Sequence, residues 1–219
     1  MHQFKLVASA FAALALSSLS LAAQAGVTFA IGGHSGSCSV FGPTPNQPEL
    51  EFRKTMTGLG PCDVVITVSG IAAGGFAEFT ISEEVVNTTG LKWHDFHHTL
   101  GYGRGAGFKE SMETDEVYFR DNFTHTGDRF ALSGQDDPIQ PDTLDWLVSG
   151  ADFPSSGLTN NKFKLGVHIQ DVDAMGVADN DGSTTFTLRQ RATIVPEPSA
   201  LSLYLLVSGA ALLAGRRRP

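Results

Sequence analysis

A strict alternation of apolar and polar residues limits the possible folds of this 219-residue chain more than any other feature of its sequence. From Lys162 to Gln170 every second residue is apolar, namely Phe163, Leu165, Val167 and Ile169. Side chains repeat every two residues in a strand and every 3.6 in a helix, so the segment predicts a strand with one buried face. Ser183 to Thr193 alternates likewise, with inward Phe186 and Leu188 and outward Thr185, Thr187, Arg189 and Arg191. We expect the two segments to pair as a hairpin.

Further segments have the composition of strands, and Gly, Pro, Asn and Asp separate them. They are Val27 to Ile31, Asp63 to Ser69, Phe76 to Asn87, Trp93 to Leu100, Val117 to Arg120, Arg129 to Leu132 and Leu144 to Val148. About nine short strands without an amphipathic helical pattern predict an all-β fold. The expected architecture is an antiparallel β-sandwich, and a barrel is the alternative.

The N-terminal end has the pattern of a signal peptide. Lys5 precedes an apolar stretch from Leu6 to Leu21, and Ala23-Gln24-Ala25 is the small-x-small pattern that signal peptidase cleaves. We therefore predict a signal peptide over residues 1–25. The folded domain is expected over residues 26–194, roughly the size of one domain.

The C-terminal end carries three signals in a fixed order. Val195-Pro196-Glu197-Pro198 should be extended, because each proline fixes its own φ and disfavours helix in the residue before it. Residues 200–215 are uncharged and predict a marginal transmembrane segment, since a bilayer core needs about 20 helical residues. Arg216, Arg217 and Arg218 should stay cytoplasmic under the positive-inside rule, which leaves the domain outside.

This tail, residues 195–219, resembles the PEP-CTERM sorting tail. The resemblance implies an exported envelope protein of a Gram-negative bacterium, held briefly in the inner membrane and passed to an exosortase. Its partners would be signal peptidase and exosortase, and its destination would be the cell surface or the extracellular matrix. An ordinary C-terminal anchor with a stop-transfer cluster is the alternative.

Without its two ends the chain is strongly acidic. When Lys5, Glu197 and the three terminal arginines are left out, the 15 basic and 23 acidic residues become 11 and 22, a net charge of −11. Such a surface repels nucleic acid and anionic membrane, so we expect no nucleic-acid partner. It suits a soluble exported protein, and a cation-binding matrix component is the alternative.

The two cysteines, Cys38 and Cys62, both lie in the expected exported domain. An oxidising compartment favours a disulfide, and closing a loop of about 25 residues stabilises a fold by roughly 3 kcal/mol. A two-thiol metal site is the alternative, but no suitably spaced histidine accompanies the cysteines. We expect the disulfide, no metal and no cofactor.

The segment from Asn87 to Gly101 resembles the Asn-Thr-Gly-x-x-Trp-x-Asp-Phe-x-x-x-Leu-Gly stretch of PEP-CTERM and other alternative-anchor β-domains. The resemblance implies a turn that leads into a core strand. Phe186 to Gln190 also resembles a segment of these proteins. His98 departs from the pattern, because those proteins usually have an apolar residue there.

His94, Asp95, His97 and His98 are the residues best suited to chemistry, since imidazole and carboxylate bind zinc or act as general acid and base. On a regular strand Asp95 and His97 share a face with Trp93. His94 and His98 share the other face and lie about 13 Å apart, too far for one zinc ion. We expect exposed or hydrogen-bonded strand histidines and no metal site.

The connection from Asp171 to Gly182 is acidic, with Asp171, Asp173, Asp179 and Asp181. The EF-hand spacing fails, because Gly182 stands where a bidentate glutamate is needed. Weak calcium binding is one interpretation, and a solvated connection with a turn at Asn180-Asp181-Gly182 is the other.

These features predict a non-catalytic exported surface or extracellular-matrix protein, with exopolysaccharide as a candidate partner. The first alternative is a carbohydrate-binding module, with stacking platforms for sugar rings at Trp93, Tyr102, Tyr118 and Trp146. The second is an exported hydrolase that uses the histidines between His94 and His98.

Overall fold

A computed structural model describes residues 26–46, 49–112, 117–149, 160–173, 176–177 and 179–194. The predicted signal peptide (1–25) and sorting tail (195–219), with its transmembrane segment (200–215), lie outside the described residues. Among the residues that are described, no helix is both long and apolar enough to cross a membrane.

The described residues form 13 strands in two sheets, together with the short 3-10 helix η1, Gly105–Gly107. The first sheet has the order β1-β4-β13-β6-β11-β10, with β7 paired to β6. Its strands are β1 Thr28–Gly36, β4 Cys62–Ser69, β13 Ser183–Ile194, β6 Trp93–Tyr102, β11 Thr143–Val148, β10 Phe130–Gln135 and β7 Lys109–Glu110.

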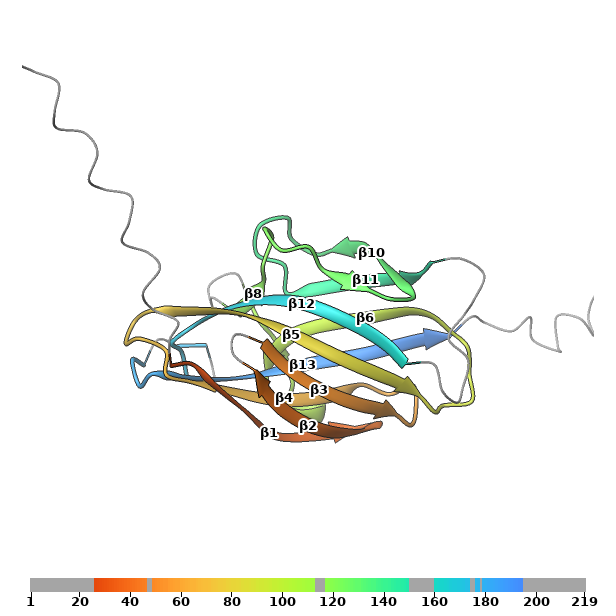
Figure 1. The fold of residues 1–219 in the computed structure, drawn as a ribbon, viewed down its shortest axis with the longest axis horizontal. Coiled ribbons are helices and arrows are strands. Elements are labelled where there is room, and N and C mark those ends of the chain that lie inside the picture. The colour runs from red at the N-terminus through yellow and green to blue at the C-terminus, as the bar shows by residue number, and fades with distance from the viewer. Residues whose placement is uncertain are drawn as a thin grey trace, which may run out of the picture.

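The second sheet has the order β2-β3-β5-β12-β8, with β9 paired to β12. Its strands are β2 Cys38–Asn46, β3 Glu49–Met56, β5 Phe76–Asn87, β12 Asn160–Gln170, β8 Val117–Phe119 and β9 Thr126–Gly127. In Figure 1, β5 and β12 cross in front of β6 and β13. The all-β prediction is confirmed, and the two sheets have the arrangement of a β-sandwich rather than of a closed barrel.

The core lies between the two sheets. The inward residues predicted for β12 and β13 are all buried: Phe163, Leu165, Val167, Ile169, Phe186 and Leu188. Thr187, predicted to point outward to solvent, is only 1% exposed. Its hydroxyl donates to the carbonyl of Gly103 at 2.7 Å, so the loop that carries η1 covers this part of the outer face.

β12 and β13 do not pair with each other, and the predicted hairpin is wrong. β12 lies antiparallel to β5 and β8 in the second sheet, whereas β13 lies between β4 and β6 in the first. The acidic connection from Asp171 to Gly182 therefore crosses from one sheet to the other. Alternation identifies the buried face of a strand but not its partner, because both sheets of a sandwich bury one face against the same core.

The second sheet is not purely antiparallel. β3 lies parallel to β5, with Leu50 opposite Ile81 and Lys54 opposite Val85. The strand between them in the chain, β4, belongs to the first sheet. The chain therefore passes from the second sheet to the first and back, and β5 runs in the same direction as β3. This parallel pair corrects the expectation of an entirely antiparallel sandwich.

The first and last described residues lie at opposite ends of the sandwich. β1 and β13 both run antiparallel to β4, so they run in the same direction. β1 begins at one end and β13 finishes at the other (Figure 1). The described chain therefore begins at one end of the sandwich and finishes, with Ile194, at the other.

Candidate functional site

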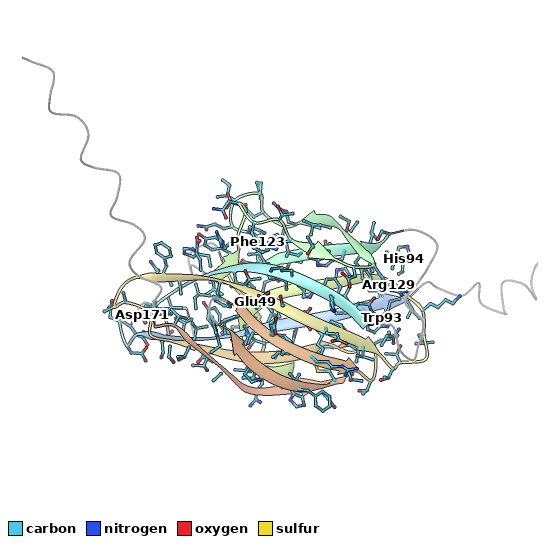
Figure 2. All side chains as sticks on the ribbon, in the orientation of Figure 1. Glu49, Trp93, His94, Phe123, Arg129 and Asp171 are labelled. Atoms are coloured by element: carbon cyan, nitrogen blue, oxygen red, sulfur yellow. A yellow bond between two sulfur atoms is a disulfide. The ribbon has the colours of Figure 1, made fainter. Side chains whose placement is uncertain are left out.

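The histidine segment begins with a β-bulge. Thr193 of β13 is opposite Asp95, and the next residue, Ile194, is opposite Trp93, so His94 is the extra residue on β6. The bulge turns Trp93 into the core, where it is fully buried, and this corrects the prediction that Trp93 shares a face with Asp95. The side chain of His94 stays 49% exposed at the same end of the sandwich (Figure 2).

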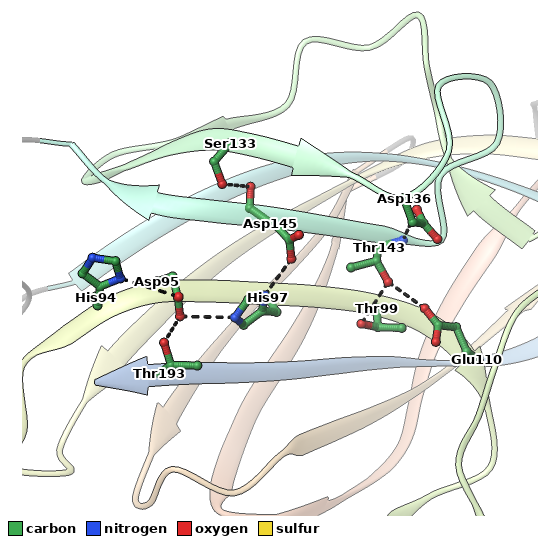
Figure 3. A network of polar contacts seen from close by, with 10 residues as sticks. All are labelled: His94, Asp95, His97, Thr99, Glu110, Ser133, Asp136, Thr143, Asp145 and Thr193. Carbon is green, nitrogen blue, oxygen red and sulfur yellow. Dashed lines mark hydrogen bonds and ion pairs between the residues drawn. The ribbon is translucent and has the colours of Figure 1, made fainter. Parts of the chain in front are cut away.

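His97 lies between two carboxylates on the outer face of the first sheet (Figure 3). Its Nδ1 is 2.6 Å from Oδ1 of Asp145 on β11, and its Nε2 is 3.2 Å from Oδ1 of Asp95. The hydroxyl of Thr193 donates to the same oxygen of Asp95. Both ring nitrogens of His97 therefore have a carboxylate partner, which is the arrangement of a hydrogen-bonded strand histidine, as predicted.

Asp95 gives this cluster a defined pH dependence. Partial burial opposes ionisation, but the hydrogen bond from Thr193 and the nearby His97 outweigh it and lower the pKa of Asp95 below its ordinary 3.8. A carboxylate with a lowered folded pKa stabilises the fold above its unfolded pKa and loses this contribution as the pH falls through the folded value. Because Asp95 is partly exposed, we expect its contribution to be less than about 1 kcal/mol.

Urea denaturation at descending pH tests this expectation. The free energy of unfolding of wild type should fall below pH 3.8 by more than that of the Asp95→Asn variant, which does not titrate. Equal losses in the two proteins would contradict the assignment.

His98 points away from His97 and lies in the core, on the face predicted from the alternation. It is fully buried, and so are Glu83 on β5, Lys54 on β3 and Gln190 on β13. Three side chains converge on the Glu83 carboxylate. Nε2 of His98 is 2.5 Å from Oε1, and Nζ of Lys54 and Nε2 of Gln190 are 2.9 and 2.6 Å from Oε2. We call these four residues the buried quartet.

The buried quartet combines an ion pair with a neutral imidazole. Burial lowers the pKa of Lys54 to about 8, although the charge of Glu83 acts in the opposite sense. Burial opposes ionisation of Glu83 as well, but Lys54 and His98 outweigh it and lower its pKa to about 2. The pKa of His98 is lowered, because burial disfavours the imidazolium more than Glu83 favours it. His98 therefore donates to Glu83 as a neutral ring.

Aromatic side chains surround the buried quartet. Nζ of Lys54 lies 5.2 Å from the centroid of the Phe96 ring, and the His98 ring meets Phe163 and Trp146 edge-on at 4.9 and 5.9 Å. Surroundings of this kind strengthen every charge interaction inside them. Within the described part of the chain, Nδ1 of His98 and Oε1 of Gln190 have no hydrogen-bond partner.

A groove of about 650 Å³ lies on the outer face of the second sheet. Phe41 of β2, whose exposed fraction is 59%, forms part of its lining. The charged lining residues carry both signs: Glu51, Arg53, Glu83, Glu84, Asp128, Lys162 and Lys164. The groove therefore offers hydrogen-bond donors and acceptors beside one exposed aromatic ring.

The aromatic residues predicted as sugar platforms are mostly core residues. Trp93 and Trp146 are fully buried and Tyr102 is 6% exposed, so these three positions are corrected. Tyr118 is half-buried, and its ring stacks on His168 with the centroids 4.6 Å apart. The exposed ring of Phe76 also stacks on His168, at 4.9 Å.

The acidic connection brings three carboxylates together at the end of the sandwich opposite Trp93 (Figure 2). Asp171, Asp179 and Asp181 each offer an oxygen within 4.8 Å of the others. Buried Asp171 also accepts the backbone N–H groups of Gly182 at 3.0 Å and Gly74 at 3.3 Å. Asn180 and Gly182 have φ values of 58° and 79°, as the predicted turn requires. Backbone hydrogen bonds thus account for the position of Asp171 without a cation.

We expect chelation to leave the melting temperature of the domain nearly unchanged. A structural metal contributes several kcal/mol, and each kcal/mol shifts the melting temperature of a domain of this size by about 2–4 °C. Thermal denaturation with EDTA, and again with added calcium, measures the effect. A fall of about 10 °C with EDTA that calcium reverses would contradict the expectation and implicate Asp171, Asp179 and Asp181.

Cys38 of β2 and Cys62 of β4 form the predicted disulfide, with their Cα atoms 5.6 Å apart. Because β2 belongs to the second sheet and β4 to the first, the bond joins the two layers of the sandwich.

The other predicted site residues, Val195, Pro196, Glu197, Pro198 and Arg216 to Arg218, lie outside the described residues. What the sequence interpretation missed is the quartet beyond His98. Each missed residue stands in the apolar phase of an alternating strand. Lys54 lies between Phe52 and Met56, Glu83 between Ile81 and Val85, and Gln190 between Leu188 and Ala192. A polar residue in that phase is the signal that identifies such a cluster.

Comparisons with known protein families, with curated proteins and with solved structures give no match for this chain.

Proposed function

We propose that this chain is a non-catalytic exported protein of the cell surface or extracellular matrix, sorted by an exosortase through its C-terminal tail. The order of the three tail signals carries the proposal: Pro196-Glu197-Pro198, apolar residues 200–215, then Arg216 to Arg218. The signal-peptide pattern of residues 1–25 supports export. The Cys38–Cys62 disulfide suits an oxidising compartment outside the cytoplasm.

The direction of the strands supports the same proposal. β13 ends at Ile194, immediately before the tail, and β1 begins at the other end of the sandwich. A membrane-held tail would therefore tether the domain by one end. The acidic connection around Asp171 would then face away from the membrane, and the outer faces of both sheets would be open to a partner.

The positions of the histidines favour a binding role over the hydrolase alternative. His97 and His98 lie on opposite faces of the first sheet, so they do not converge on one substrate. Both ring nitrogens of His97 contact carboxylates, those of Asp145 and Asp95, and His98 is enclosed in the core. General acid-base work requires a group within hydrogen-bond reach of the substrate.

Carbohydrate binding is the second candidate function, and the groove beside Phe41 favours it. Sugar hydroxyls both donate and accept hydrogen bonds, which matches a lining that carries Arg53 and Lys162 together with Glu84. An exposed aromatic ring can stack on the apolar face of a sugar.

Titration calorimetry with exopolysaccharide fragments tests this second candidate. We expect the Phe41→Ala variant to lose roughly tenfold in affinity, the loss that corresponds to about 1.4 kcal/mol. The Leu132→Ala variant, which removes an exposed apolar residue of the first sheet, is the matched control and should bind as wild type does. Equal affinity of both variants would exclude the groove.

Replacement of both Pro196 and Pro198 by alanine tests the sorting proposal. Alanine would let the extended segment join the apolar helix, so recognition should fail and the full-length protein should accumulate in the inner membrane. The measurement is the size and membrane fraction of the tagged domain, in cells with and without exosortase.

Replacement of Arg216, Arg217 and Arg218 by serine is the companion variant. It removes the orientation signal but keeps the Pro-Glu-Pro element, so retention before processing should weaken instead. If both variants and the exosortase-free strain release the same product as wild type, the tail is only an anchor and the sorting proposal is wrong.

A further inference from the structure

One oxygen atom of Glu83 contacts both an amine and a carboxamide in the core. Oε2 lies 2.9 Å from Nζ of Lys54 and 2.6 Å from Nε2 of Gln190. The shared oxygen keeps the amine and the carboxamide near each other, and such proximity favours a reaction between them. We propose that Lys54 and Gln190 join in an intramolecular isopeptide bond, with Glu83 as the catalytic residue that moves the proton.

The reaction is a transamidation in which every atom is accounted for. Nζ of Lys54, as the free amine, attacks Cδ of Gln190, and a new C–N bond forms. Oε2 of Glu83 accepts a proton from the attacking nitrogen and passes it to Nε2, which it also contacts. The bond between Cδ and Nε2 then breaks, and ammonia leaves. No oxidant or reductant is needed, and the Glu83 carboxylate returns to its starting form.

The quartet prepares its lysine for attack. An amine is a nucleophile only when uncharged, and burial lowers the pKa of Lys54 to about 8, so more of it is the free base than in a surface lysine. His98 is a positioning residue. Its Nε2 holds Oε1 of Glu83 at 2.5 Å, which leaves Oε2 directed at the two reacting nitrogens.

The surroundings protect the product from water. Phe96, Phe163 and Trp146 enclose the groups and limit hydrolysis of the new amide by water.

The bond would join the two sheets at a second point. Lys54 lies on β3 of the second sheet and Gln190 on β13 of the first, as Cys38 and Cys62 do on β2 and β4. β13 is the last described strand, so this covalent link would hold the strand that precedes the tail. Formation of this bond does not depend on how the tail is processed.

Mass spectrometry of the intact protein tests the proposal. The full chain is expressed in cells, purified in whatever processed form the cells produce, and its disulfide is reduced before the measurement. We expect a mass lower by one ammonia than the sequence of the isolated product requires. A protease digest should contain a branched peptide that joins Lys54 to Gln190. An unmodified mass would overturn the proposal, and so would the loss of one water in a branch between Lys54 and Glu83.

Three variants assign the roles. Glu83→Gln has nearly the same size but cannot accept the proton, and Lys54→Arg keeps the positive charge but removes the amine, so both should retain the full mass. Lys92→Met, which removes an exposed lysine, is the matched control and should still lose ammonia. Loss of ammonia in Glu83→Gln would overturn the role of Glu83. The wild-type mass decides the proposal even if a core variant fails to fold.

Discussion

Replacement of Glu83 by leucine is expected to destabilise the domain by about 3–5 kcal/mol. The change leaves the ammonium of Lys54 in an apolar interior without its counter-charge, and it removes the acceptor of both His98 and Gln190. Chemical denaturation monitored by tryptophan fluorescence measures the loss, because Trp146 packs against His98 in the same part of the core.

The double variant Glu83→Leu with Lys54→Met isolates the cause. It removes the unpaired charge and fills the space with apolar atoms, so it should be more stable than Glu83→Leu alone. Neither protein can form the proposed isopeptide bond, and the comparison is therefore independent of it. Glu84→Gln is the matched control for position and charge. Its partner Arg53 lies 3.7 Å away on the outer face, so the expected change is below about 1 kcal/mol. A Glu83→Leu variant as stable as this control would refute the buried ion pair.

Alternation located the strands that have one regular buried face. Phe76 to Asn87 was predicted with the bounds that β5 has, and the prediction for β12 differs only in where the strand begins. β2 and β3 were missed, and so were the two-residue strands β7 and β9. β2 contains Pro43 and Pro45, which break a strand pattern, and its register shifts between Phe41 and Thr44. Proline is tolerated there because β2 is the edge strand of its sheet, where a missing N–H breaks no ladder on the open side.

The local sequence pattern could not predict the register of the strands or the partner of each strand. The bulge at His94 moves Trp93 into the core, and nothing within β6 alone indicates it, because a bulge is a property of two paired strands. The quartet shows the same limit. The sequence placed His98 on the strand face opposite His97, but Lys54, Glu83 and Gln190 meet it only because four strands from two sheets face one another.

Removal of the Cys38–Cys62 disulfide is expected to lower the free energy of unfolding by about 3 kcal/mol. The bond closes a loop with a sequence separation of 24 and joins the two sheets, so without it the unfolded chain gains conformational freedom. For a domain of this size the corresponding fall in melting temperature is about 10 °C.

The double variant Cys38→Ala with Cys62→Ala is the suitable protein for this measurement, because each single variant leaves a thiol that can pair between molecules. Wild type treated with a reductant is the control, and its melting temperature should fall by a similar amount. The fold should survive in both, since the other members of the core cluster, among them Phe96, Phe163 and Leu165, are unchanged. An unchanged melting temperature in both proteins would mean that the bond does not constrain the unfolded chain. A loss confined to the double variant would instead assign the effect to the packing of Cys62, which is fully buried.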